Sequence, residues 1–284
     1  PNLGRTTSRA SLLQSIKMRG NMSLQKLATV LILGLITLAP ATAAPTSADT
    51  PPIEEEARAK IQAMSDYLRA SRSFSFNAEV QFDDLLPSGQ KITFTAQNSV
   101  SLQRPDGIFS NHTSDTGNRK FWFNGHEICL LDPANGTYAS EPFTGNTDKA
   151  IDHMIKVLRF TPPLSDFLYE NPAKALLAHT RHGFIVGKSL INGVQTTHLA
   201  FVDEFTDWQI WIQDGKLPLP VRFAITYKTI NNSPQYVATF SGWDFTSRLP
   251  STLFQPELPR GSVKLPFLKE SEAIKINSTL PKQN

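Results

Sequence analysis

Hydrophobic and polar residues follow two different periods along this chain. From residue 53 the apolar side chains recur at steps of three and four, at Ile53, Ala57, Ile61, Met64 and Leu68. This spacing predicts a helix with one apolar stripe. Pro51 and Pro52 suit its first turn, and the glutamates at 54–56 suit the positive end of its dipole.

From Ser73 the period changes to two. Phe74, Phe76, Ala78, Val80 and Phe82 share one face of an extended strand, and Ile92, Phe94, Ala96, Val100 and Leu102 align in the next run. A Pro-Ser-Gly turn at 87–89 separates the two runs, which predicts an antiparallel pair. Asn-Gly pairs at 124–125 and 135–136 predict two further hairpin turns.

Residues 147–180 interrupt the strands. Ile151, Met154, Ile155 and Leu158 have helical spacing, the proline pair at 162–163 ends that helix, and 164–170 and 172–180 predict two more short helices. The segment therefore resembles a broken helical lid. Five further strands follow from Gly183, with turns that include 192–193 and 214–215.

Together these elements predict an α+β fold. One domain over residues 45–268 holds a curled antiparallel sheet of about ten strands, a half-open β-barrel, with an N-terminal helix and inserted lid helices. Residues 269–284 are polar and predict a C-terminal tail. Helices that cover the open face of such a sheet would leave a hydrophobic cleft, which is typical of a binding protein.

The charge of the chain changes when its first 44 residues are set aside. The full sequence of 284 residues has a formal charge of +3 and a pI near 9.0, but residues 1–44 hold five basic residues and no acidic ones. The remaining 240 residues carry 23 Lys and Arg against 25 Asp and Glu, a net charge of −2. Nucleic-acid binding therefore has no support from composition.

The same N-terminal residues predict export. Lys17, Arg19 and Lys26 precede an apolar run at 27–38, and an Ala-rich stretch follows. This order is typical of a secretory signal peptide, so we expect 1–44 to be an upstream extension and a signal peptide cleaved after Ala43 or Ala44. No cysteine follows the apolar run, so we expect a soluble periplasmic protein without a lipid anchor.

Candidate catalytic and metal-binding residues do not form a recognisable set. The single cysteine, Cys129, lies in an apolar strand and is expected to be a buried hydrophobe. His126 and Glu127 match the start of the zinc-binding motif His-Glu-x-x-His. Residue 130 is leucine, so the second histidine of that motif is missing. His179 and His182 lack a third ligand. We therefore predict no catalytic residue, no metal and no cofactor.

Several blocks of sequence resemble a known family. The run DWQIWIQDGKLPLPVRFAITYK at 207–228 and the run SPQYVATFSGWDF at 233–245 are similar to predicted bacterial periplasmic proteins that are classified only as a domain of unknown function. Earlier blocks, such as FWFNGHEICLLDP at 121–133, fit in the same order, and the resemblance covers about residues 55–245. The family looks like a branch of the LolA/LolB/LppX lipoprotein-carrier superfamily. The resemblance implies a half-open barrel whose hollow holds acyl chains, or a regulator with the same fold, and it implies no catalytic residues.

Our leading hypothesis is a non-catalytic carrier or chaperone that binds a lipid, an acyl chain or a lipoprotein in the cleft. The partner would be a hydrophobic or acylated ligand, or an envelope lipoprotein or other membrane-associated protein, and we expect a monomer. The expected lining residues are Phe74, Phe76, Phe82, Ile92, Phe94, Val100, Ile210, Ile212, Phe223, Ile225 and Phe240, with Met154, Leu158, Phe167 and Leu168 in the lid. Ordinary core packing is the alternative interpretation of each of them.

Two other hypotheses remain open. An envelope regulatory or scaffolding module would bind a protein partner through a sheet edge or the Pro-rich C-terminal segment, and it would have no lipid cavity. An enzyme acting on an exported polymer would rest on carboxylates such as Asp203, Glu204 and Asp207. These acidic residues fall near strand ends, where such side chains normally face solvent.

Overall fold

One twelve-stranded sheet is the main element of residues 52–267, the part of the chain that the computed structural model describes. The predicted signal peptide over 1–44 and the predicted tail over 269–284 lie outside these residues. The strands are β1 (Ser73–Leu85), β2 (Lys91–Gln103), β3 (Gly107–Ser114), β4 (Gly117–Phe123), β5 (Glu127–Asp132), β6 (Thr137–Pro142), β7 (His182–Ile191), β8 (Val194–Val202), β9 (Thr206–Gln213), β10 (Pro220–Tyr227), β11 (Gln235–Asp244) and β12 (Val263–Lys264).

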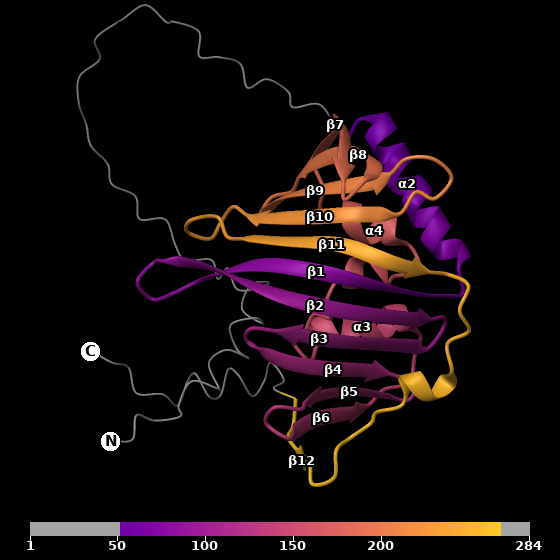
Figure 1. Ribbon diagram of the computed structural model, residues 1–284, viewed down its shortest axis with the longest axis vertical. Coiled ribbons are helices and arrows are strands. Elements are labelled where there is room, and N and C mark those ends of the chain that lie inside the picture. Colours follow the sequence, from indigo (N-terminus) through magenta and orange to yellow (C-terminus); the bar gives the residue numbers. More distant parts are fainter. Residues whose placement is uncertain (1–51, 268–284) are drawn as a thin grey trace, which may run out of the picture. The chain divides into compact units, whose positions relative to one another are not determined.

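The strand order shows how the two halves of the chain meet. It runs β12-β6-β5-β4-β3-β2-β1-β11-β10-β9-β8-β7 (Figure 1). β1 to β6 form one antiparallel meander, β7 to β11 form a second, and β11 joins them by pairing antiparallel with β1. β7 and β12 are the two edges, so the sheet is open in the described part of the chain. The predicted α+β fold with a curled, half-open sheet is confirmed.

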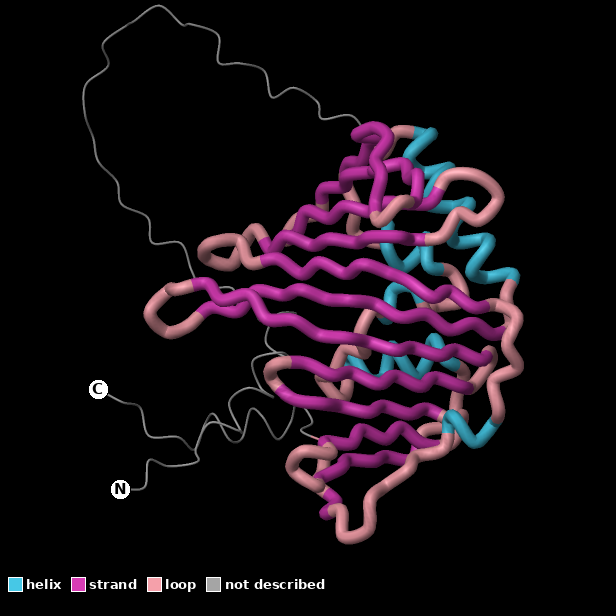
Figure 2. The backbone as a smooth tube through the Cα atoms, in the orientation of Figure 1, coloured by secondary structure: helices cyan, strands magenta, loops and turns pink. Residues whose placement is uncertain are grey.

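Each strand of the central pair separates an apolar from a polar side. Phe74, Phe76, Ala78 and Val80 of β1 are buried, whereas the alternating residues Asn77, Glu79 and Gln81 are exposed. The buried side faces the helices, and we call it the inner face and the opposite side the outer face. Figure 2 shows the longer helices gathered behind the sheet on its inner face. The period-two pattern therefore identified this face correctly.

The N-terminal helix is the predicted one. α2 (Glu55–Ala70) buries Ala57, Ile61, Met64 and Leu68 completely, and it contacts α4 and β7. Two glutamates lie in its first turn and Arg69 in its last, where each charge is favourable to the helix dipole.

The segment that interrupts the strands, residues 147–180, is called the lid below. It holds α3 (Thr147–Lys156), the single 3-10 turn η1 (Ser165–Phe167) and α4 (Pro172–Leu177). Asn146 and Asn171 cap α3 and α4 through their side-chain oxygens, which accept from the backbone N–H three residues on. The predicted helix over 164–170 is reduced to η1, because Leu164 takes a left-handed conformation and the Asn171 cap follows too soon for a second turn.

Two strands were missed by the sequence analysis. β3 alternates poorly, since its inner face carries Ser110 and His112 beside Ile108, so it lacked the apolar period of its neighbours. β12 is two residues long and pairs in parallel with β6. The Pro-rich segment after Trp243 is therefore partly built into the sheet.

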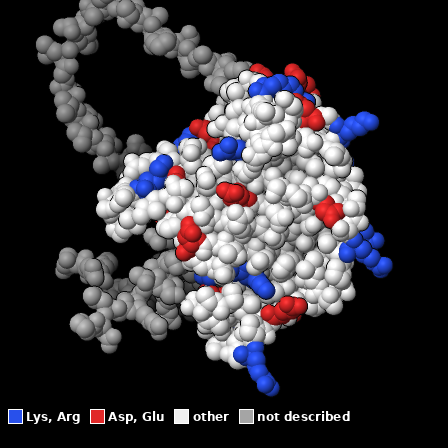
Figure 3. Space-filling model, in the orientation of Figure 1, with Lys and Arg blue, Asp and Glu red and all other residues white. Residues whose placement is uncertain are grey.

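A second, smaller apolar cluster lies on the outer face. Trp122, Cys129 and Leu131 are buried there, with Phe109 and Tyr138 packed against them. η2 (Ser251–Phe254) places Phe254 beside Gly107, where a Cβ atom would come within 3.1 Å of the ring. Close packing therefore favours glycine at 107. Figure 3 views this outer face and shows that charged side chains are sparse over the middle of the sheet.

Candidate functional site

The predicted cleft lies between the lid and the inner face, and in this structure the lid packs directly on the sheet. The ring of Phe167 in η1 lies 5.3 Å from that of Phe223 and 5.1 Å from that of Phe240. Phe240 in turn lies 5.5 Å from Phe76 of β1. These aromatic contacts close the space between the lid and the strands at this point.

Most of the predicted lining residues come together in one buried cluster. It contains Phe74, Phe76, Val100, Ile210, Ile212, Phe223, Ile225 and Phe240 from the sheet and Met154, Leu158, Phe167 and Leu168 from the lid. They are core residues in this state.

Three predicted lining residues lie beyond the lid, at the end of the β1–β2 hairpin. Phe82 packs at the margin of the buried cluster, and its ring lies 5.7 Å from that of Phe94 across the strand pair. Pairing of β2 with β3 begins only at Ala96, so Ile92 and Phe94 have β1 as their only neighbouring strand. All three side chains are half-buried. We call residues 82–94 the hairpin tip, and Figure 1 shows it extending past the neighbouring strands.

Arg104 fastens the C-terminal part of the lid to the sheet and to α2. Its Nη1 donates to the carbonyl oxygens of Ser71 at 2.9 Å and Leu68 at 3.3 Å, and its Nη2 donates to that of Tyr169 at 2.9 Å. Burial lowers the pKa of Arg104, while the nearby carboxylates of Asp148 and Glu170 act in the opposite direction. Sequence analysis missed this residue because it lies in a turn.

α2 and α4 are joined by a second set of polar contacts. The Ser65 hydroxyl accepts from the backbone N–H of Ala173 at 3.0 Å and donates to Asn171 Oδ1 at 3.3 Å. The middle of the lid is built differently: Arg159 and Leu164 adopt left-handed conformations on either side of the proline pair at 162–163. Such conformations are strained for residues with a side chain. The lid thus has a fastened C-terminal part and a strained middle.

A row of four polar side chains, called the polar row below, crosses the inner face from β2 to β5. It consists of Asn98 of β2, His112 of β3, Arg119 of β4 and Asp132 of β5. His112 Nδ1 lies 2.8 Å from Asn98 Oδ1, and Arg119 Nη2 lies 3.1 Å from Asp132 Oδ2. Burial, followed by the positive charge of Arg119, lowers the pKa of His112. Sequence analysis missed this row together with β3.

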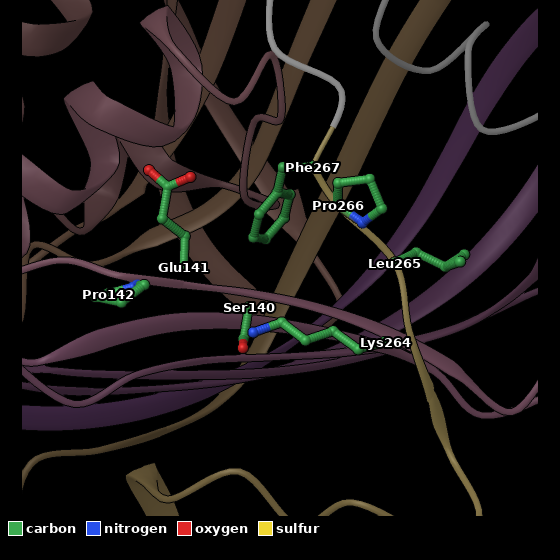
Figure 4. Close-up of a pocket in the computed structure, with 7 residues that line it drawn as sticks. All are labelled: Ser140, Glu141, Pro142, Lys264, Leu265, Pro266 and Phe267. Carbon is green, nitrogen blue, oxygen red and sulfur yellow. The ribbon is translucent and has the colours of Figure 1, made fainter.

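A pocket of about 670 Å³ opens where β6 meets the C-terminal segment. Its lining residues are Ser140, Glu141, Pro142, Lys264, Leu265, Pro266 and Phe267 (Figure 4). Glu141 Oε1 lies 2.9 Å from Nε2 of His153 in α3, which ties the pocket wall to the lid. Phe267 is the member that joins the main buried cluster. The pocket thus adjoins the β6 edge of the inner face.

The residues considered for catalysis are either buried or paired with a basic side chain. Cys129 is fully buried, as predicted, and burial raises the pKa of its thiol to about 12. Asp207 pairs with Lys228 at 2.8 Å, and Glu204 pairs with Arg181 at 2.6 Å. Within residues 52–267, no three His, Cys, Asp or Glu side chains are grouped so that they could hold a metal ion. The same part of the chain contains no helix long and apolar enough to cross a membrane.

Comparison with known proteins gives a family match and remote structural likenesses. A family model described as "Predicted periplasmic protein (DUF2092)" matches residues 57–268. No curated protein matches the chain.

Among solved structures, an uncharacterized conserved protein from Thermus thermophilus is 10% identical with a TM-score of 0.44, over 75% of this chain and 99% of that one. LprF from Mycobacterium bovis is 15% identical (TM-score 0.41, 70% and 98% covered), and a LolA superfamily protein from Nitrosomonas europaea is 11% identical (TM-score 0.35, 70% and 97% covered).

Proposed function

Because this chain belongs to the family of predicted periplasmic proteins DUF2092, we propose that it is a non-catalytic periplasmic protein that binds an acyl chain, a lipid or an acylated protein on its inner face. We further propose that it reaches the periplasm by a cleaved signal peptide and carries no lipid anchor. The observation that supports ligand binding is that the apolar inner face continues beyond the lid. Phe82, Ile92 and Phe94 are half-buried there, although residues of this kind are normally covered.

In this proposal the hairpin tip binds the ligand first, and the lid then moves to admit it. An acyl chain first covers the half-buried side chains of the hairpin tip and then displaces the strained middle of the lid. The lid residues Met154, Leu158 and Phe167 pack on the sheet when the protein is empty and on the ligand when it is loaded. Each buried CH₂ group contributes about 0.8 kcal/mol, so a long chain can compensate for the lost packing.

The experiment is a fluorescence titration of residues 45–284 with 11-(dansylamino)undecanoic acid. We expect saturable binding, and we expect Phe94→Ser to weaken it about tenfold, because one aromatic contact with the ligand is lost. The melting temperature should change little, since Phe94 lies outside the main cluster. Phe184→Ser is the matched control: Phe184 is 46% exposed on β7 and should leave binding unchanged.

Absence of saturable binding by the wild-type chain would overturn the proposed function. Equal binding by the wild type and Phe94→Ser would show that the ligand does not contact the hairpin tip.

A second candidate function is protein binding at the edge strand β7 beyond Ile185. No described strand pairs with this edge, and Glu54 bonds it only at Gly183 and Ile185. Phe184, Val186 and Leu190 are 46%, 50% and 61% exposed there, and Val186 lies in a bulge. Exposed apolar edge strands are templates for strand addition. If this candidate is correct, Val186→Lys should abolish capture of one defined periplasmic protein and leave the dansyl titration unchanged. Equal capture by the wild type and by Val186→Lys would rule out protein binding at β7.

A further inference from the structure

The polar row lies in direct cross-strand register with the apolar part of the inner face. Ala78 of β1 is opposite Asn98, Asn98 is opposite His112, and His112 is opposite Arg119. Asp132 continues the row through its ion pair with Arg119. A line drawn across the strands therefore passes from an apolar residue to neutral polar groups and then to a charged pair.

The polar row is not needed for the backbone hydrogen bonds of the sheet. Asn98 is 2% exposed and lies between Ala96 and Val100 on β2, both members of the main apolar cluster. The backbone groups of β2 and β3 already pair with each other and with their neighbouring strands. Burial of an amide and an imidazole has a cost in free energy that an apolar pair would avoid. This cost calls for a role other than stability.

The row also has unused hydrogen-bonding capacity. In the pair as placed, His112 Nδ1–H donates to Asn98 Oδ1, which leaves His112 Nε2 and Asn98 Nδ2. Within residues 52–267, the bond to Asn98 is the one hydrogen bond of the pair, and neither remaining atom is among the fully buried side-chain atoms without a partner, so both are open to a partner from outside the protein. Because burial and Arg119 lower the pKa of His112, its ring is neutral at pH 7 and Nε2 is an acceptor. One acceptor and one amide donor thus lie side by side.

The charges of the row select among headgroups. Arg119 is paired with Asp132, so the four residues carry no net charge when His112 is neutral. A hydroxyl group can donate to the imidazole and accept from the amide, whereas a carboxylate can only accept and would face the imidazole lone pair and Asp132. The arrangement therefore suits an uncharged headgroup.

From this geometry we infer that the polar row is a headgroup subsite and that the ligand is an amphiphile with an uncharged, hydroxyl-bearing headgroup, such as glycerol or a sugar. This inference rests on the proposed function, since it assigns the apolar part of the same face to the acyl chain. The headgroup binds at His112 and Asn98, and the chain extends across β1 and β11 towards the lid.

The experiment compares two probes that share one acyl chain, 1-monopalmitoylglycerol and palmitate, by displacement of the dansyl probe at pH 7.5. The wild-type chain should bind monopalmitoylglycerol about tenfold more tightly than palmitate, because only the first can use both free atoms of the subsite. His112→Leu should remove this preference by weakening monopalmitoylglycerol about tenfold, with palmitate changed less than twofold.

His198→Leu is the matched control. His198 lies on the outer face, and like His112 it bonds a side-chain amide, with its Nε2 2.9 Å from Gln209 Oε1. Its substitution should change neither affinity. The wild-type preference is an independent measurement, and it decides the question even if His112→Leu does not fold.

The outcomes separate the two proposals. Tight binding of both probes with no wild-type preference, or a preference that survives in folded His112→Leu, would overturn the headgroup subsite and leave the acyl-chain site in place. Failure of both probes to bind would overturn the proposed function, and the subsite with it.

Discussion

Arg104 is a single side chain on which the position of the lid depends. Its guanidinium bonds carbonyl oxygens at the end of α2 and in the lid, and it lies 5.6 Å from the ring of Phe74. Arginine suits this position because its donors form a planar fork that reaches several acceptors at once. Lysine has the same charge but would reach fewer of these oxygens.

Arg104→Met should lower the free energy of unfolding by about 2 kcal/mol, because hydrogen bonds from a charged group are lost and buried carbonyl groups are left unpaired. Hydrogen exchange should also become faster around Tyr169. Urea titration and exchange mass spectrometry measure the two effects. Arg248→Met, at an exposed position, is the control and should change neither. Unaltered exchange around Tyr169 in the Arg104 variant would show that the lid does not depend on this residue.

Cys129 gives a second prediction at the scale of one residue. With its pKa raised from 9.0 to about 12, the thiol should hold roughly a thousandfold less thiolate at pH 8 than an ordinary cysteine. Native protein should therefore react very slowly with Ellman's reagent, and protein unfolded in guanidinium should react at once. The absorbance of the released thionitrobenzoate measures both rates. A fast reaction of the native protein would contradict the burial of Cys129 beneath the outer-face cluster.

At the scale of elements, the hairpin tip depends on Asp83, which lies where the tip begins. Its carboxylate accepts from Thr93 Oγ1 at 2.6 Å and from the backbone N–H of Gln235 at 2.9 Å, and it lies 3.1 Å from Lys91 Nζ. Burial alone would raise the pKa of Asp83, but these three partners outweigh it and lower the pKa below 3.8. One carboxylate thus joins β1, β2 and the start of β11.

Because the folded-state pKa is lowered, the ionised Asp83 stabilises the protein above about pH 4 and this contribution is lost as the pH falls through the folded-state value. Asp83→Asn should therefore be less stable than the wild type at pH 7, by about 1 kcal/mol. The difference should shrink as the pH falls below 3.8. Urea titrations from pH 7 to pH 2.5 measure it, and a difference that is constant with pH would contradict this role.

The elements also show where sequence analysis succeeded and where it failed. α2, β1 and β2 were predicted because each buries apolar residues at one regular spacing. β3 carries Ser110 and His112 inside and Phe109 outside, so no period was visible. The turn residues Pro105-Asp106-Gly107 and Asp115-Thr116-Gly117, about ten residues apart, were the signal that could have revealed it.

The candidate site was predicted in the same uneven way. That Phe82, Ile92 and Phe94 share one face could be predicted, because they follow the strand period, and their contact with a ligand stays a prediction. Which apolar residues pack beneath the lid could not, since core and cavity walls use the same side chains. The polar row could not be predicted either, because its four residues come from four strands and one of those strands was missed.

At the scale of the molecule, the two faces of the sheet differ in chemistry. The inner face is apolar under the lid and polar along the row from Asn98 to Asp132, whereas the outer face is largely uncharged and is packed only where η2 and its neighbours cover it. A soluble protein normally covers one face of an antiparallel sheet and exposes the other. The inner face of this sheet is only partly covered by its own helices, which leaves the apolar side chains of the hairpin tip half-buried.

The pairing of β1 with β11 has a consequence for how the chain folds. The two strands lie about 150 residues apart in sequence, yet they are adjacent at the centre of the sheet, so the native state depends on contacts of very long range, which form slowly. While the chain folds, β1 to β6 can assemble as a meander before the edge of β1 has a partner, and that edge is open to pairing with other chains until β11 joins it. A chain truncated before residue 235 should therefore aggregate rather than fold into a stable half.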